Sequence, residues 1–127
     1  MAKQIISTEN APGAVGPYSQ AVVANGFVFT AGQVGLIPGT KTLAEGGIQG
    51  QTRQVLENLK AVLEAAGTSL EQVVKATVFL SDMGDFAAMN EIYGQYFSQN
   101  PPARSTFAVA GLPMGAMVEI EVVALLS

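Results

Sequence analysis

Two stretches of the chain show the spacing of an amphipathic helix. Between Ile48 and Ala66, apolar side chains recur every three or four residues and charged side chains occupy the opposite face. This pattern predicts a helix that ends at Gly67. A second helix is expected from Asp82, whose side chain can cap it, to about Phe97. Its apolar inner stripe is expected to consist of Phe86, Met89, Tyr93 and Phe97.

Shorter apolar runs near the start of the chain predict strands. Residues 3–6 are expected to form an edge strand. The runs Ala21–Ala24 and Phe27–Ala31 flank Asn25-Gly26. Because Asn-Gly between apolar runs is a strong signal for a two-residue turn, this region is predicted to be a β-hairpin.

The rest of the chain contains one irregular stretch and three further strands. Glycine and proline interrupt residues 32–47, which are expected to be irregular. Val73–Leu80 is apolar on both faces and rich in β-branched residues, which predicts a central strand covered on both sides. The last two strands are expected at about 104–110 and 117–125.

The expected order of elements is β-β-β-α-β-α-β-β. Strand–helix–strand crossovers are nearly always right-handed, so both helices should cover the same face of a single sheet. We therefore expect residues 1–127 to form one α+β domain of two layers, a mixed β-sheet and two helices. Apolar side chains line both sides of the last strand, with Val118, Ile120, Val122 and Ala124 on one side and Val123 and Leu125 on the other. No third layer remains for the second side, and packing of sheets in an oligomer would cover it.

Charged residues make up 13% of the 127 residues, against roughly 25% in ordinary soluble proteins. A buried subunit interface is the simplest explanation for so few charges. The net charge is −4 and no run of Lys or Arg occurs, so binding of nucleic acid through a basic patch is not expected.

The sequence has neither the apolar segment of a signal peptide nor a window that could span a bilayer, so we expect a cytoplasmic protein and no membrane partner.

Histidine and cysteine are both absent. This excludes Ser-His-Asp and Cys-His catalysis, and it removes the commonest metal ligand. No acidic cluster shows metal-ligand spacing, and residues 32–47 lack the pattern of a P-loop or of a dinucleotide site. We therefore expect neither a metal nor another cofactor.

Arg104 is one of two arginines, and it follows Pro101-Pro102 at the start of an apolar strand. Glu119 lies in the next strand, and if the two strands pair, the guanidinium and the carboxylate can meet at one half-buried place. A guanidinium binds a carboxylate through two parallel hydrogen bonds, which suggests a pocket for a small acid. The alternatives are a solvent-exposed Arg104 and a solvated strand face that carries both Glu119 and Glu121.

Two further polar residues are candidates for a site. Asn90 lies beside Met89 and Tyr93 on the apolar stripe of the second helix, where a buried amide must find partners. It either satisfies backbone groups in the core or points into a site. Tyr18 follows Gly16-Pro17 in a loop, where it either packs against the fold or presents its hydroxyl to a ligand.

Short motifs in one consistent order run along nearly the whole chain. The most specific is Pro102-Ala103-Arg104-Ser105, followed by Phe107, Leu112 and Val118-Glu119-Ile120. The others are Asn10-Ala11-Pro12, Gly16-Pro17-Tyr18, Thr30-Ala31-Gly32-Gln33, Ala65-Ala66-Gly67 and Val78-Phe79-Leu80. Together these motifs resemble those of the RidA (YjgF) family of reactive-intermediate deaminases.

The resemblance implies a chorismate-mutase-like fold assembled as a homotrimer, in which three sheets form a central barrel and the active sites lie between subunits. It also implies hydrolysis of 2-imino acids or their enamine tautomers, such as 2-iminobutanoate and 2-iminopropanoate, to 2-oxo acids and ammonia. These intermediates leak from pyridoxal-phosphate enzymes and damage others of that class, so the implied role is protective.

The resemblance also assigns roles to individual residues. Arg104 would hold the substrate carboxylate, and Glu119 would orient or activate the attacking water. Tyr18 and Asn90 would line the cleft between subunits. No cofactor is implied by this scheme.

Three more substrate-binding positions follow from the resemblance. The backbone at Gly32 and Thr106 would contact the ligand. The family often has serine where this chain has Ala31, so a hydroxyl near the substrate is lost there. It also often has cysteine in place of Thr106, whose backbone groups remain usable.

Three alternative functions are open on the same scaffold. The first is a non-enzymatic sensor or chaperone that binds 2-oxo acids. The second is an RNA-cleaving translation inhibitor, an activity attributed to some family members, although the acidic charge and the lack of histidine argue against it. The third is a chorismate-mutase-like rearrangement, which needs several cations around a dicarboxylate, whereas this chain has two arginines.

Overall fold

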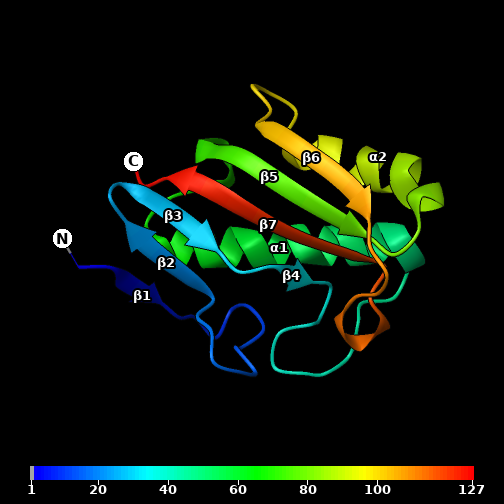
Figure 1. Cartoon of the computed structure of the whole chain (residues 1–127), viewed down its shortest axis with the longest axis horizontal. Coiled ribbons are helices and arrows are strands. Elements are labelled where there is room, and N and C mark those ends of the chain that lie inside the picture. The colour runs from blue at the N-terminus through cyan, green and yellow to red at the C-terminus, as the bar shows by residue number, and fades with distance from the viewer. Residues whose placement is uncertain (1) are drawn as a thin grey trace.

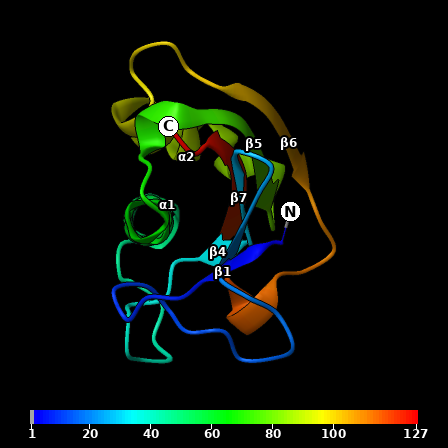
Figure 2. The same ribbon diagram turned by 90° about the vertical axis from the view of Figure 1, so that its left-hand side faces the viewer.

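The structure is a computed structural model that describes residues 2–127. It shows a seven-stranded sheet with two helices packed on one of its faces (Figures 1 and 2). The strand order is β1-β2-β3-β7-β5-β6, and β4 also pairs with β7. Among the strand pairs of this described part, only β5 and β6 run parallel. The prediction of a two-layer α+β fold with a mixed sheet is confirmed.

The first three strands form an antiparallel meander of β1 (Gln4–Ile6), β2 (Ala21–Ala24) and β3 (Phe27–Thr30). Asn25 and Gly26 connect β2 to β3 with φ angles of 52° and 81°. Positive φ at both central residues is what a type I′ hairpin turn requires, and Asn and Gly tolerate it. The hairpin prediction is confirmed.

β4 (Gln33–Val34) lies in the stretch that was expected to be irregular. It is two residues long and exists through its pairing with β7, where Gln33 faces Ile120 and Val34 faces Glu119. Such a short strand leaves no alternating pattern in the sequence. The expectation of a wholly irregular 32–47 stretch was therefore wrong at this point.

α1 (Gly47–Ala66) presents the predicted apolar face to the sheet. Its central side chains are fully buried: Val55, Leu56, Leu59, Val62 and Leu63. Gly67 ends the helix at φ 92°, and its N–H donates to the carbonyl of Glu64 at 3.0 Å. A left-handed residue at this point favours glycine, as predicted.

α2 (Phe86–Tyr96) begins later than expected, because a short 3₁₀ turn (Met83–Asp85) precedes it. The side chain of Asp82 accepts a hydrogen bond from the N–H of Gly84 at 2.8 Å. Asp82 therefore caps the 3₁₀ turn and not the α-helix itself. Met89, Ile92 and Tyr93 are the buried residues of α2.

The central strands are β5 (Val73–Leu80) and β7 (Val118–Leu125), and β6 (Ala103–Ala108) forms the outer edge. Alternate residues of β7 are buried beneath the helices: Val118, Ile120, Val122 and Ala124. Two further 3₁₀ turns, Leu70–Gln72 and Pro113–Gly115, precede β5 and β7.

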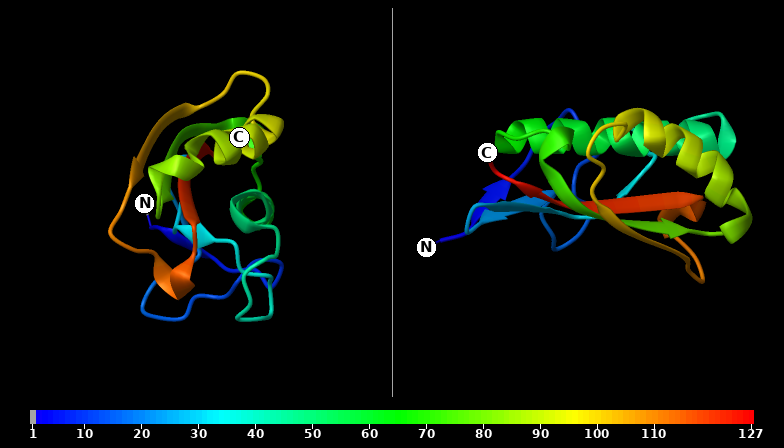
Figure 3. Two further views of the ribbon diagram at one scale, coloured as in Figure 1. Left: turned by 90° about the vertical axis from the view of Figure 1, so that its right-hand side faces the viewer. Right: turned by 90° about the horizontal axis from the view of Figure 1, so that it is seen from above.

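No helix covers the second face of the sheet, which we call the open face (Figure 3). Phe29 and Phe107 remain 45% and 46% exposed there. The expectation that β5 is covered on both sides is therefore not met within one chain, because its helix-facing residues are buried and those on the open face, Thr77 and Phe79, are only partly buried. Neither helix in residues 2–127 combines the length and apolarity needed to cross a membrane.

Candidate active site

Arg104 lies on β6 and turns its side chain toward α2. Its register partner on β5 is the buried residue Ala76, so Arg104 belongs to the helix-covered face of the sheet. One guanidinium nitrogen donates to Oδ1 of Asn90 at 2.7 Å. The guanidinium carbon lies 4.7 Å from the ring centre of Tyr93 and 5.4 Å from that of Phe86. Hydrogen bonding and cation–π attraction together orient the guanidinium over the helix.

The partners of Arg104 come from one stripe of α2. Phe86, Asn90 and Tyr93 stand at spacings of four and three residues, so they share one helix face. Asn90 is exposed, and the expectation of a buried amide was wrong because this residue sits at the edge of the helix–sheet contact. The pattern of aromatic, amide and aromatic residues was the signal in the sequence for this arrangement.

Two hydroxyl groups in this region are buried without a partner. Within residues 2–127, neither Oγ1 of Thr106 nor the phenolic oxygen of Tyr93 has a hydrogen-bond partner. Burial raises the pKa of Tyr93, against the opposing effect of the nearby Arg104 charge, so the phenol stays protonated near neutral pH. Thr106 follows Arg104 by two residues on the same strand face. We call Arg104, Asn90, Thr106, Phe86 and Tyr93 the Arg104 half-site.

Glu119 lies on the open face of β7. Its sequence neighbours Val118 and Ile120 are fully buried beneath the helices, and the alternation of a strand turns Glu119 the other way. Its register partners are Val34 on β4 and Phe79 on β5. Partial burial is the main cause that raises the pKa of Glu119 above its ordinary value of 4.5, and the negative charge of Glu121 adds to it.

The carboxylate of Glu119 packs directly against the backbone of Gly32. A Cβ atom added at Gly32 would lie 2.8 Å from Cδ of Glu119 and closer still to its Oε2. The absence of a side chain at Gly32 therefore allows this close approach, and a larger residue would displace the carboxylate. The preceding residue, Ala31, is partly buried and donates its backbone N–H to the carbonyl of Gln20 at 2.9 Å.

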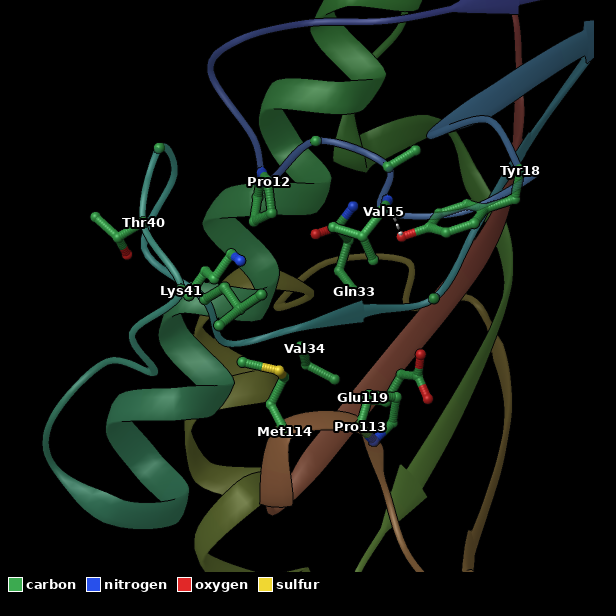
Figure 4. Close-up of a pocket in the computed structure, with 15 residues that line it drawn as sticks. Pro12, Val15, Tyr18, Gln33, Val34, Thr40, Lys41, Pro113, Met114 and Glu119 are labelled. Carbon is green, nitrogen blue, oxygen red and sulfur yellow. Dashed lines mark hydrogen bonds between the residues drawn. The ribbon is translucent and has the colours of Figure 1, made fainter.

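A cavity of about 680 Å³ opens beside Glu119 (Figure 4). Tyr18, Gly32 and Glu119 line it, and further walls come from residues 12–15, from β4, from the turn at 39–41 and from Pro113-Met114. The Tyr18 ring is 50% exposed, and its hydroxyl accepts a weak hydrogen bond from the N–H of Val15 at 3.4 Å. We call Tyr18, Ala31, Gly32 and Glu119, with this cavity, the Glu119 half-site.

The two half-sites do not meet within one chain. β5 separates β6 from β7, so the strands that carry Arg104 and Glu119 are not neighbours. The two residues also lie on opposite faces of the sheet. The condition on which the two side chains could meet, direct pairing of these strands, is therefore not fulfilled within one chain. In residues 2–127 no three His, Cys, Asp or Glu side chains are grouped closely enough to hold a metal ion.

Comparison with known proteins identifies the relatives of this chain. The sequence profile described as Endoribonuclease L-PSP, which is that of the RidA proteins, matches residues 8–126. The chain belongs to the RidA family. It is 57% identical over 128 residues to a RutC family protein of Synechocystis sp.. That match covers 99% of this chain and 98% of the Synechocystis protein.

Two other similar proteins are informative. The human protein named 2-iminobutanoate/2-iminopropanoate deaminase is 47% identical over 123 residues, covering 97% of this chain and 90% of that protein. The crystal structure of TdcF from E. coli, which contains bound serine, superposes with a TM-score of 0.92 at 44% identity. That match covers 98% of this chain and 99% of the TdcF chain. The family resemblance seen in the motifs is confirmed.

The sequence patterns missed several parts of the two half-sites. The cavity walls at 12–15, 39–41 and 113–114 have no common periodicity, because they are irregular segments brought together by the sheet. Gln20, which is almost completely buried beside the first of these segments, was also missed. A single polar residue before a strand carries no local signal of its role.

Proposed function

We propose that this protein hydrolyses 2-imino acids to 2-oxo acids and ammonia at sites formed between copies of the chain. The observation that carries the proposal is the division of the candidate residues into two half-sites on opposite faces of the sheet. One half-site presents a fixed cation and the other a carboxylate at the margin of a cavity. Binding an acid and activating a water at one place requires both halves, and a second copy supplies the missing one.

The open face supports assembly with further copies. Its side chains include Phe29, Phe107 and Leu125, which are 45%, 46% and 37% exposed. Phe107 also meets Phe79 edge to face, with ring centres 5.4 Å apart. Burial of such surface favours association by about 25 cal/mol per Å² of apolar area. A homotrimer with a central barrel of three sheets is the proposed assembly, and β6 as an edge strand would face a neighbouring copy.

In this scheme, Arg104 holds the substrate carboxylate. A guanidinium has five N–H donors, and the bond to Asn90 uses one of them. Hydrogen bonds to charged groups contribute about 1.5–3 kcal/mol each, enough to retain an acid of three or four carbons. The TdcF structure contains serine, which also carries a carboxylate. Asn90 and the backbone at Thr106 complete this side of the site.

Glu119 of a neighbouring copy activates the water. Its raised pKa makes the ionised carboxylate a better proton acceptor than an ordinary glutamate. Water adds to the carbon of the protonated imine as Glu119 takes a proton, and Glu119 returns that proton to the nitrogen. The C–N bond then breaks and releases ammonia, as the new hydroxyl group loses its proton and becomes the carbonyl of the 2-oxo acid. The products are one 2-oxo acid and one ammonia for each imino acid and water consumed. Tyr18 and the backbone at Ala31 and Gly32 line this side, and the scheme needs no cofactor.

The proposed substrates are 2-iminobutanoate and 2-iminopropanoate, which the name of the human relative supports. Both are electrophiles that arise in pyridoxal-phosphate enzymes. Their removal in the cytoplasm would protect other enzymes of that class. Because the uncatalysed hydrolysis is not slow, positioning of water and imine is sufficient for a useful acceleration.

The direct test is to release 2-iminobutanoate from a threonine dehydratase and to follow the appearance of 2-oxobutanoate and ammonia. We expect hydrolysis to be faster with the protein than in buffer with an equal mass of albumin. Equal rates, together with tight binding of 2-oxobutanoate, would instead favour a sensor. Since the family profile is described as an endoribonuclease, RNA cleavage by the same preparation is the second activity to measure.

A further inference from the structure

The loop at residues 7–19, which we call the first loop, connects β1 to β2. It contains no helix or strand, yet it carries Tyr18 and the cavity wall at 12–15. Most of its residues from 12 to 18 are exposed. The conformation of this loop decides the shape of one side of the cavity, so the contacts that hold it are relevant to binding.

One buried side chain holds the first loop. Gln20 is 3% exposed and lies immediately before β2. Its Oε1 accepts the N–H of Thr8 at 2.7 Å. Its Nε2 donates to the carbonyls of Pro12 at 2.8 Å, Thr8 at 3.0 Å and Ala11 at 3.4 Å. Both ends of this amide are thus bonded to backbone groups of the loop.

Three further hydrogen bonds lie inside the first loop. They join Asn10 to Thr8, Val15 to Tyr18, and Tyr18 to Gly16. Within residues 2–127, the side-chain hydrogen bonds that join residues 7–19 to a residue outside this range therefore all end on Gln20. The methyl group of Ala11, which is 2% exposed, adds one apolar anchor.

Gln20 is also linked to the carboxylate side of the cavity. Its backbone carbonyl accepts the N–H of Ala31 at 2.9 Å. Ala31 precedes Gly32, against which the Glu119 carboxylate packs. Gln20 itself is not among the residues that line the cavity. Gln20 therefore connects the first loop to the backbone beside Glu119 without lining the cavity itself.

We propose that Gln20 is a positioning residue that holds the first loop, and with it Tyr18, in the conformation that binds the substrate. This inference rests on the proposed deaminase function. It predicts a specific kinetic split, because the first loop carries Tyr18 and one cavity wall, whereas Glu119 is on the central strand β7. Loss of Gln20 should therefore weaken binding more than it slows the chemical step.

The test compares Gln20→Met with the control Thr52→Val. Methionine keeps the length and apolar stem of Gln20 and removes all four hydrogen bonds. Thr52 is equally buried, but its hydroxyl bonds to the carbonyl of Ile48 within α1, far in sequence from the first loop. We expect Gln20→Met to raise KM about tenfold or more with a smaller change in kcat. Thr52→Val should leave KM unchanged when both variants are measured well below their unfolding temperatures.

Gln20→Glu is a second variant, and its effect on KM can be predicted relative to that of Gln20→Met. Its carboxylate would face three carbonyl oxygens, so KM should exceed that of Gln20→Met. Wild-type KM in Gln20→Met, or equal changes in Gln20→Met and Thr52→Val, would overturn the inference. An inactive unmodified protein would instead contradict the proposed function.

Amide hydrogen exchange of the unmodified protein keeps the inference testable if the variants do not fold. The Thr8 N–H, bonded to Gln20, should exchange more slowly than the amides of Gly13 and Ala14. Addition of 2-oxobutanoate should slow exchange across residues 8–18 further. Exchange of Thr8 as fast as that of Gly13 would show that Gln20 does not hold the loop.

Discussion

The Arg104 half-site and the Glu119 half-site are built in different ways. Arg104 stands on a strand and is held by three side chains of one helix, at 2.7 Å from Asn90 and over the rings of Tyr93 and Phe86. Glu119 also stands on a strand, but the walls around it are loops and turns. The Arg104 guanidinium is thus fixed by regular structure, whereas the shape of the cavity beside Glu119 depends on irregular backbone.

The pleat of the strands also explains why the two half-sites do not meet in one chain. The same alternation that buries one face of β7 turns Glu119 to the open face, and the register of β6 turns Arg104 to the helix face. A change at Arg104 should therefore affect mainly binding of the acid, and a change at Glu119 mainly activation of water. Substitutions at the two half-sites separate these functions.

Replacement of Arg104 by alanine should have the largest effect. Loss of two charge-assisted hydrogen bonds, at about 1.5–3 kcal/mol each, predicts a fall in kcat/KM of roughly 100-fold or more. The matched control is Arg53→Ala, which removes the other arginine, an exposed residue of α1 bonded to Gln95 at 3.2 Å. Steady-state kinetics and size-exclusion chromatography check the prediction. Near-normal activity in Arg104→Ala would contradict the role of Arg104 in binding the substrate.

Mixing two inactive variants should restore activity. In an assembly of Arg104→Ala and Glu119→Gln chains, some interfaces combine an intact Arg104 of one copy with an intact Glu119 of another. Random mixing predicts recovery of about a quarter of the unmodified activity in a cyclic oligomer. The variants are unfolded together, refolded and assayed. If the mixture stays as inactive as its components, the two residues do not act across an interface.

Glu119→Gln should lower kcat by roughly 100-fold, because glutamine does not accept the proton, while binding of 2-oxobutanoate changes little. In the unmodified protein, kcat should fall as the pH decreases through the pKa of Glu119, which lies above 4.5. The variant should lack this acidic limb in its pH profile. An effect confined to binding would contradict the role of Glu119 in activating water.

The same variant has an expected effect on stability. The raised pKa of Glu119 means that the fold favours the protonated carboxyl group over the ionised carboxylate. The stabilisation from the protonated group is fully present below the ordinary pKa, and it is lost as the pH rises through the pKa of the folded protein. Glutamine does not ionise. Glu119→Gln should therefore be at least as stable as the unmodified protein at pH 7, and thermal unfolding at pH 4 and pH 7 checks this. A clear loss of stability at pH 7 would show that the ionised carboxylate is well satisfied in the fold.

Gly32→Ala should have the smallest of these effects. The added methyl group would displace the flexible carboxylate of Glu119 without touching Arg104, so kcat should fall by roughly tenfold with little change in affinity for 2-oxobutanoate. Gly13→Ala is the control, because a Cβ at Gly13 meets no atom within 4 Å although this residue also lines the cavity. Equal kinetics for the two variants would show that Gly32 does not position Glu119.

Much of the fold could be predicted from local patterns. The spacing of apolar residues predicted α1, and Asn25-Gly26 predicted the hairpin, because both signals lie within a few residues. β4 could not be predicted, since its two residues become a strand by pairing with β7, which is far away in the sequence. The position of β5 between β6 and β7 is likewise a non-local choice.

The candidate site could be predicted as a set of residues but not as a geometry. Family motifs pointed to Arg104 and Glu119, and their strands were located nearly correctly. Their separation onto opposite faces depends on which strands become neighbours and in what register, and neither is encoded locally. The role of Gln20 follows from four hydrogen bonds to residues that lie 8 to 12 positions earlier in the sequence. No periodic pattern in the sequence indicates such bonds.

The place of β7 in the sheet has a consequence for biosynthesis. This strand is made after all the others, yet it joins β3 and β4 on one side to β5 on the other. Until residue 125 has left the ribosome, the nascent polypeptide has two unconnected groups of strands, each with a bare hydrogen-bonding edge. Chains that stall before β7 should therefore be prone to aggregate and to depend on chaperones, whereas in chains that include β7 the two groups are joined in one sheet.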